Sequence, residues 1–220
     1  DLHRRRHSFP TRRSSDLGGG VVGDLAGFCA ATYFRGVHFV QVPTTLLAQV
    51  DSAVGGKVGI NFQTVKNGVG AFYQPLCIVS DTETLKTLPP REYKAGLAEV
   101  LKYGLIAETA TGQHSDFLAF LEQHGNGGAS HLGNLVTRCC AIKSTVVARD
   151  ETEADPSHVS GRVCLNLGHT FAHAYEAATG YKRFLHGEAV VLGLGLACRL
   201  SEQLGLLPAS EKNRCFALAD

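Results

Sequence analysis

The chain lacks an excess of charge of either sign, since its 220 residues hold 21 lysines and arginines against 20 aspartates and glutamates. Proteins that bind nucleic acid or a membrane surface by electrostatics carry a strongly basic face, so we expect neither partner here. The chain also has no apolar run near the about 20 residues needed to cross a bilayer. With 44% hydrophobic and 19% charged residues, its composition is that of an ordinary folded protein.

The seven cysteines include no C-x-x-C pair, which argues against a zinc ribbon or a redox motif. Their number is odd, and the neighbours Cys139 and Cys140 could form a disulfide only with strain. Most of the others, such as Cys29 and Cys164, lie in apolar surroundings, as buried free thiols do. We therefore expect a reduced, cytoplasmic protein.

The pattern of residues divides the chain into three parts. Residues 1–17 contain five arginines and no periodic apolar pattern, and we expect a leader foreign to the fold in preference to a basic arm that binds nucleic acid. Residues 18–88 alternate helical and strand patterns, with strands expected at 37–42 and 76–80, and predict a partial Rossmann-like parallel α/β layer. Residues 89–220 show helical spacing at 92–106, 114–124, 129–149, 168–179 and 188–204, and predict a mainly α-helical domain.

Three histidines near the end of the chain form the most informative pattern. His169 and His173 are four residues apart in a helical segment, so both imidazoles face the same side of the helix. His186 follows after the break at Gly180, in a segment expected to be a loop. A single histidine is more often a packed core residue, but three converging imidazoles indicate a metal or substrate centre.

A carboxylate and a lysine lie three residues apart in the segment 96–104. Glu99 and Lys102 share a helix face, where they could form an ordinary surface ion pair. Alternatively, Glu99 completes a site of two histidines and one carboxylate that leaves open positions for substrate oxygens. Lys143 and Arg162 are further cations that a phosphorylated or carboxylated substrate would need.

Two glycine-containing segments have the features of anion-binding loops. The segment 18–24 joins a tight turn to a helix, which suits a pyrophosphate, although a plain strand–helix turn would look similar. It lacks the spaced dinucleotide fingerprint. In the segment 51–57, Lys57 follows two glycines within reach of an anionic ligand, but without the spacing of an NTPase loop.

Together these motifs resemble the 3-dehydroquinate synthase family of sugar-phosphate cyclases. The resemblance is carried by the segments 18–28, 35–36, 41–52, 55–57, 98–104, 166–170 and 185–188, and it covers essentially everything after Leu17. The chain departs from the family pattern at Ala172, where glycine is common. It also lacks the family's two terminal regions, so we expect it to be a fragment.

The resemblance implies an NAD- and metal-dependent lyase of the shikimate pathway of aromatic amino acid biosynthesis. Its members convert 3-deoxy-D-arabino-heptulosonate 7-phosphate into 3-dehydroquinate and phosphate by transient oxidation, phosphate elimination, re-reduction and aldol closure. The implied metal is zinc, with cobalt as the alternative, and the implied assembly is a homodimer. Other candidates are 2-deoxy-scyllo-inosose synthase and a metal-dependent alcohol dehydrogenase of similar fold. Two cations, Lys143 and Arg162, favour the substrate that carries a carboxylate.

The resemblance also implies a role for each matching residue. The metal ligands would be Glu99, His169 and His186. The NAD site would consist of Gly19, Gly20, Val21, Val22, Gly23, Asp24, Thr44, Thr45, Lys57, Lys66, Asn67, Thr84, Leu85, Lys86 and Thr87. The substrate and the chemistry would be handled by Arg35, Asp51, Lys57, Lys102, Lys143, Arg162, Asn166 and His173.

Overall fold

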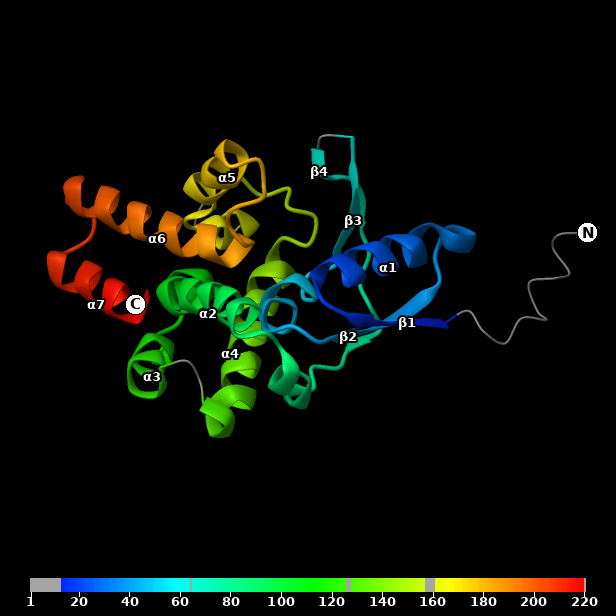
Figure 1. Ribbon diagram of the computed structural model, residues 1–220, viewed down its shortest axis with the longest axis horizontal. Helices are drawn as coiled ribbons and strands as arrows, with labels where there is room; N and C mark the ends of the chain where they lie inside the picture. The colour runs from blue at the N-terminus through cyan, green and yellow to red at the C-terminus, as the bar shows by residue number, and fades with distance from the viewer. Residues whose placement is uncertain (1–12, 64, 126–127, 157–160, 220) are drawn as a thin grey trace, which may run out of the picture.

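The computed structural model describes residues 13–63, 65–125, 128–156 and 161–219, which form a small α/β part and a larger helical part (Figure 1). Three strands, β1 (Arg13–Gly18), β2 (His38–Pro43) and β5 (Cys77–Ile78), pair in parallel in the order β1-β2-β5. Helix α1 (Gly20–Thr32) and the 3₁₀ turn η2 (Tyr33–Arg35) connect β1 to β2. This is the parallel sheet with a crossover helix that the sequence predicts.

Strand β1 corrects the expected boundary at residue 17. Residues 13–18 pair with residues 38–43 of β2 along the whole strand, although we expected residues 1–17 to lie outside the fold. The ladder uses main-chain N–H and C=O groups, so a polar sequence can fill the strand position that precedes the glycine loop. Asp16 is buried as a result, with 6% of its surface exposed. Residues 1–12 of the expected leader lie outside the described residues.

A β-hairpin that the sequence analysis did not predict follows the first two strands. Strands β3 (Lys57–Phe62) and β4 (Val65–Phe72) are antiparallel and project away from the parallel sheet (Figure 1). Lys57, expected in an anion-binding loop, is the first residue of β3, and Asn67 lies within β4. Gly59 faces Gly70 across the hairpin, and Ile60 faces Val69 in the next pair. Glycine inside a strand weakens the sequence signal of that strand.

The helical part is built around one long buried helix, α2 (Pro90–Thr111). It packs against α4 (Gly128–Arg149) and α6 (His186–Gln203), and the shorter helices are α3 (Phe117–His124), α5 (His169–Ala178) and α7 (Ala209–Ala219). The π-helical turn η3 (Ala48–Ser52) and the 3₁₀ helices η4 (Thr82–Thr87) and η5 (Arg162–Asn166) complete the described elements. Helix α7 was not predicted, and α6 begins two residues before its predicted start. His186 consequently lies in a helix and not in a loop.

The main core joins the two parts of the chain. Leu46 and Val50, beside and within η3, pack with Val100 and Tyr103 of α2 and Leu135 of α4, all nearly or completely buried. This packing places η3 directly against α2 and α4, so polar side chains of the first part meet those of the second. Among the described residues, no helix is long and apolar enough to cross a membrane.

Candidate metal and substrate site

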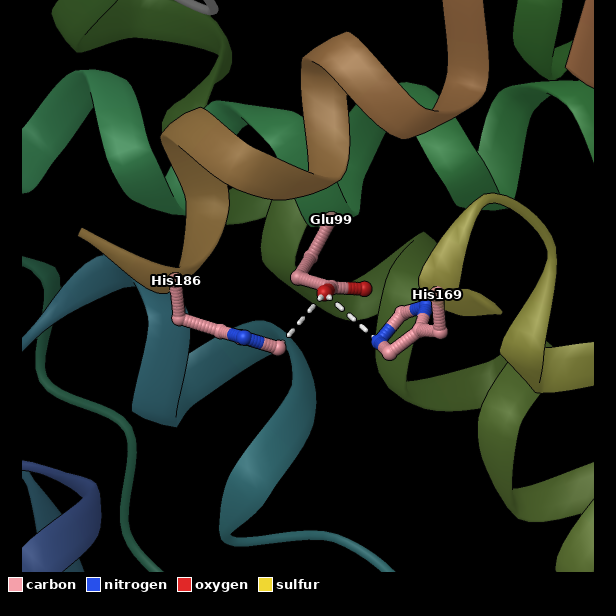
Figure 2. A group of neighbouring side chains, drawn as sticks. All are labelled: Glu99, His169 and His186. Carbon is pink, nitrogen blue, oxygen red and sulfur yellow. Dashed lines mark ion pairs between the residues drawn. The ribbon is translucent and has the colours of Figure 1, made fainter. Parts of the chain in front are cut away.

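Glu99, His169 and His186 come together from three different helices, as Figure 2 shows. Glu99 Oε1 lies 3.5 Å from Nε2 of His169 and 3.8 Å from Nε2 of His186. One ligand atom from each residue lies within 4.8 Å of the other two. Ligand atoms bound at about 2.1 Å to one tetrahedral ion are about 3.4 Å apart, so small side-chain adjustments would bring these three to one ion.

The local backbone explains how His169 reaches this point. Gly168 caps α5 in a left-handed conformation, with φ of +78°, which favours glycine. A side chain there would also collide with α6, because a Cβ would lie 2.8 Å from the main-chain nitrogen of Leu194. The turn places Nδ1 of His169 3.2 Å from the main-chain oxygen of Leu167, so that Nε2 faces Glu99.

His186 is placed by the start of α6. The neighbouring Gly187 packs so closely on α2 that a Cβ there would lie 1.9 Å from the main-chain oxygen of Ala95. Glu188 accepts a hydrogen bond from the main-chain N–H of Leu185 at 2.9 Å and pairs with Arg91 of α2 at 2.7 Å. The first turn of α6 is therefore fastened to α2, the helix that carries Glu99.

The donor set fits a divalent metal ion. The side chain of Glu99 is completely buried, and its Oε1 accepts no hydrogen bond from the part of the chain that the structure describes. A buried carboxylate oxygen without a donor is costly unless a cation satisfies it. Burial lowers the pKa of His169, which keeps its imidazole neutral and able to bind a metal at neutral pH. Two imidazole nitrogens and one carboxylate oxygen suit zinc or cobalt.

A second polar cluster adjoins the first and consists of Asp51, Lys102, Tyr103 and Lys143. Lys102 contacts Glu99 Oε2, and its Nζ lies 3.9 Å from Asp51 Oδ1. The Tyr103 hydroxyl donates to Asp51 Oδ1, and Lys143 Nζ lies 2.9 Å from the same oxygen. Lys102 therefore joins the histidine site to a buried group of two lysines and one aspartate.

The charges in this cluster support one another. Burial disfavours the ionised form of Asp51, but Lys143 and Lys102 outweigh that effect and hold its pKa well below the ordinary range. Burial likewise disfavours the charged form of Lys102, and the carboxylates of Asp51 and Glu99 raise its pKa. For Lys143 burial is the stronger effect and lowers the pKa. The cluster thus holds ammonium groups in surroundings where a phosphate or a carboxylate would be bound strongly.

His173 and Asn166 lie at the open side of the histidine cluster. His173 is exposed, and its ring centre is 5.7 Å from that of His169 and 6.3 Å from that of His186. Asn166 is exposed at the end of η5, three residues before His169. The role expected of these two side chains, contact with a bound molecule, stays a prediction.

The glycine segment lines a small cavity at the start of α1, where the sequence predicts an anion-binding loop. Gly19 caps the helix, and Gly18, Gly19, Gly20, Gly23 and Asp24 line this cavity. A Cβ at Gly20 would lie 2.9 Å from Ser52 Oγ, and one at Gly19 would lie 3.1 Å from Thr45 Cγ2. Close backbone approach at a helix N-terminus is the arrangement that binds a pyrophosphate. Val21 and Val22, by contrast, are exposed side chains on this first turn.

The segments 44–45 and 84–87 meet beside this cavity through a buried glutamine. The main-chain N–H of Thr44 donates to Gly18 at 2.9 Å, which brings the end of β2 next to the glycine loop. The side-chain amide of Gln49 donates to the main-chain oxygens of Pro43 and Asp81 and to Thr84 Oγ1. Within η4, Leu85 is buried and Lys86 pairs with Glu83 at 2.6 Å.

Arg162 is buried and bonded to the main chain. It is 2% exposed, and its terminal nitrogens donate to the main-chain oxygens of Gly55 at 3.1 Å and Glu151 at 2.7 Å. Its guanidinium also lies over the Phe72 ring. These contacts make Arg162 a tie between the glycine turn before β3 and the segment after α4. The role expected of Arg162 in selecting a carboxylated substrate stays a prediction.

Four other predicted residues belong to the turn η2 and to the hairpin β3–β4. Arg35 is exposed in η2, beyond the C-terminal end of α1, while the glycine segment is at the N-terminal end, about 18 Å of helix away. Lys57 is half exposed and pairs with Glu153. Lys66 and Asn67 belong to β4 of the projecting hairpin. Residues close in a motif can thus be separated when a helix or hairpin lies between them.

Several residues of the site were not predicted from the sequence. Glu176 approaches His186, Tyr103 binds Asp51, and Gln49 joins three segments. A signal existed for Glu176, because it is seven residues after His169 and therefore on the same helix face. Tyr103 directly follows the predicted Lys102, and Gln49 lies two residues before the predicted Asp51. No sequence pattern distinguishes either residue from an ordinary core residue.

Comparisons with known proteins agree with these motifs. Residues 7–95 match the family described as 3-dehydroquinate synthase N-terminal, and residues 96–220 match 3-dehydroquinate synthase C-terminal. A 3-dehydroquinate synthase of Acidithiobacillus ferrooxidans is 50% identical over 208 residues, which are 93% of this chain and 54% of that protein. One of Pseudomonas fluorescens is 54% identical over 206 residues, 92% of this chain and 53% of that protein. The chain thus spans about half the length of these relatives.

Several solved structures share the fold of this chain. A 2-deoxy-scyllo-inosose synthase complexed with carbaglucose-6-phosphate, NAD⁺ and Co²⁺ is 30% identical, with a TM-score of 0.79 over 93% of this chain and 55% of that one. A 2-epi-5-epi-valiolone synthase of Streptomyces hygroscopicus with NAD⁺ and Zn²⁺ is 26% identical, with a TM-score of 0.74 over 95% and 57%. A glycerol dehydrogenase of Schizosaccharomyces pombe, 18% identical, shares the fold alone. The chain belongs to the 3-dehydroquinate synthase family.

Proposed function

We propose that this chain carries the catalytic centre of a 3-dehydroquinate synthase, which converts 3-deoxy-D-arabino-heptulosonate 7-phosphate into 3-dehydroquinate and phosphate. The observation that carries the proposal is the buried Glu99, whose two oxygens face a pair of imidazoles on one side and Lys102 on the other. A metal position and an ammonium group next to each other suit a substrate with reacting oxygens and an anionic group. A 3-dehydroquinate synthase with 50% sequence identity to this chain supports the same assignment.

Two cofactors would bind at the two sites described above. Glu99, His169 and His186 would hold a divalent ion, zinc or cobalt, and the glycine segment at 19–24 with segments 44–45 and 84–87 would hold NAD. When bound, the ion acts as a Lewis acid toward a substrate hydroxyl, and NAD accepts and returns a hydride. The likeness to cyclases solved with NAD⁺ and Zn²⁺ or Co²⁺ supports this pair of cofactors.

The residues of the chain itself bind and orient the substrate. Lys102 and Lys143 would neutralise its anionic groups, and Asp51 keeps both ammonium groups in place through its oxygens. His173, at the open side of the histidine cluster, would approach the phosphate and supply a proton as it departs. Holding these groups around one bound substrate replaces several encounters with one bound geometry.

Binding and turnover test the proposal separately. Calorimetric titration of the metal-free chain with Zn²⁺ should show one site, which His186→Ala should remove. Phosphate release from the seven-carbon substrate should require both NAD and metal and should stop after chelation. Release that continues without either one would contradict the mechanism. Glucose 6-phosphate as substrate distinguishes the related 2-deoxy-scyllo-inosose synthase activity, and net NADH accumulation with an alcohol would indicate a dehydrogenase.

The assembly and cellular location remain part of the same proposal. Family membership supports a homodimer in the full-length protein. The seven cysteines form no disulfide in the structure, which agrees with a cytoplasmic enzyme. Light scattering on the full-length relative and on this chain would measure the first of these directly.

A further inference from the structure

A second carboxylate, Glu176 of α5, lies behind the histidine cluster. Its side chain is 5% exposed, and its Oε1 is 3.0 Å from Nδ1 of His186. A carboxylate oxygen accepts a hydrogen bond from an imidazole N–H, so this contact selects the form of His186 that carries its proton on Nδ1. In that form Nε2, which lies 3.8 Å from Glu99 Oε1, has its lone pair free.

We propose that Glu176 is the positioning residue of the metal centre, which fixes the ring orientation and the tautomer of His186. The inference rests on the proposed function, because it assumes that Nε2 of His186 binds the ion. Ligating histidines generally donate their other N–H to a carboxylate or a main-chain oxygen, and loss of that partner weakens metal binding.

The fold gives Glu176 this role through helix geometry. Glu176 is seven residues after His169, so both side chains point from the same face of α5 toward α6. Ala172 lies between them on that face and is completely buried. The helix face therefore delivers one metal ligand and the partner of another ligand to the same site.

The two histidines are held in matching ways. Nδ1 of His169 lies 3.2 Å from the main-chain oxygen of Leu167, which can only accept, so this nitrogen also carries the proton. Both rings are thus anchored through Nδ1 and present Nε2 to Glu99. His169 receives its partner from the backbone, which no substitution removes, whereas the partner of His186 is a side chain and is open to mutation.

The first experiment reads the tautomer without any metal. Long-range ¹H–¹⁵N spectra of the metal-free chain at mildly alkaline pH, assigned with a His186→Gln variant, should show His186 protonated on Nδ1. Glu176→Gln keeps an acceptor oxygen of the same size and should retain this tautomer. Glu176→Ala should shift His186 toward the form protonated on Nε2. An Nε2-protonated His186 in the unsubstituted chain, or in Glu176→Gln, would overturn the inference.

The second experiment measures metal affinity by competition with a chromophoric chelator for Zn²⁺. Glu176→Ala should weaken binding about 10- to 100-fold, and Glu176→Gln should weaken it less. Glu202→Ala is the matched control, because it removes a carboxylate of α6 that pairs with Lys212 away from the site, and its affinity should be unchanged. Circular dichroism of the metal-free variants checks that each one folds.

The outcomes separate this inference from the proposed function. If the unsubstituted chain binds Zn²⁺ no better than His186→Ala, the metal centre itself is wrong. If it binds Zn²⁺ tightly and Glu176→Ala binds equally tightly, the metal centre stands and the positioning role is wrong. If Glu176→Ala does not fold, the tautomer in the unsubstituted chain and in Glu176→Gln still decides the question.

Discussion

Gly187 is the position where a single methyl group should disturb the site most. A Cβ there would lie 1.9 Å from the main-chain oxygen of Ala95, which is 1.1 Å short of the 3.0 Å below which real Cβ atoms are essentially never found. The two other nearest atoms, at 2.5 and 2.7 Å, are also main-chain atoms of Ala95. Because α2 cannot yield as a flexible side chain would, the start of α6 must move by about 1 Å or more.

The expected cost of Gly187→Ala follows from that displacement. Overpacking of a tight contact lowers the free energy of unfolding by about 1–3 kcal/mol. We expect a value of about 3 kcal/mol here, because the obstacle is main chain that cannot move aside. For a chain of this size, each kcal/mol lowers the unfolding midpoint by about 2–4 °C, so we expect a drop of about 6–12 °C. His186 is the preceding residue, so Zn²⁺ affinity should fall by at least about tenfold as its ring moves away from Glu99.

The assays are urea unfolding and thermal unfolding, both followed by circular dichroism, and chelator competition for Zn²⁺. Gly133→Ala is the matched control, because Gly133 is an exposed position within α4 and a Cβ there meets nothing within 4 Å. That variant should be more stable by about 0.5–1 kcal/mol, since alanine favours a helix more than glycine does. If Gly187→Ala unfolds and binds Zn²⁺ as the unsubstituted chain does, the close contact between α6 and α2 does not exist.

Three further predictions concern charge and metal. Asp51→Asn leaves two buried ammonium groups without their shared carboxylate and should lower the free energy of unfolding by about 3–5 kcal/mol at neutral pH. Because the pKa of Asp51 is lowered in the folded state, the difference measured by urea titration should be complete above the ordinary aspartate pKa, shrink as pH falls below it, and vanish once pH passes the lowered pKa. Burial raises the pKa of Asp16, so the folded state binds the Asp16 proton more tightly than the unfolded state does. The free energy of unfolding should therefore fall as pH rises from the ordinary aspartate pKa through the raised one, and Asp16→Asn should be more stable at neutral pH by about 1–3 kcal/mol. Equal stability of the two proteins across the pH range would contradict the burial of this side chain. Zn²⁺ at a hundredfold excess over its Kd should stabilise the chain by about 2.7 kcal/mol in thermal unfolding, an effect that EDTA removes and that His169→Ala should not show.

Local patterns predicted most of the helices because their apolar faces repeat at helical spacing. The predicted segments 92–106 and 129–149 correspond to α2 and α4, with ends that differ by a few residues. The hairpin β3–β4 was missed although Val58, Ile60 and Phe62 alternate along β3, because the glycines at 55, 56, 59, 68 and 70 favoured a loop and a turn. Strand β1 was missed because its pairing depends on main-chain groups that a polar sequence supplies equally well.

The sequence by itself determined which chemical groups the chain can offer. Glu99 and the imidazoles of His169 and His186 indicated a metal site before any fold was known. Lys102, on the same helix face as Glu99, indicated a positive charge beside that site, and the glycines at 18–20 indicated an anion-binding loop. These inferences depend on helical periodicity and on residue chemistry, which are local properties.

Only the tertiary structure decided which of these groups meet. Packing of η3 against α2 and α4 placed Asp51 between Lys102 and Lys143, and packing of α5 on α6 placed Glu176 against His186. The same packing turned Arg162 toward main-chain oxygens and left Arg35 at the far end of α1. Contacts between residues distant in the chain depend on how whole elements pack, and no local spacing contains that information.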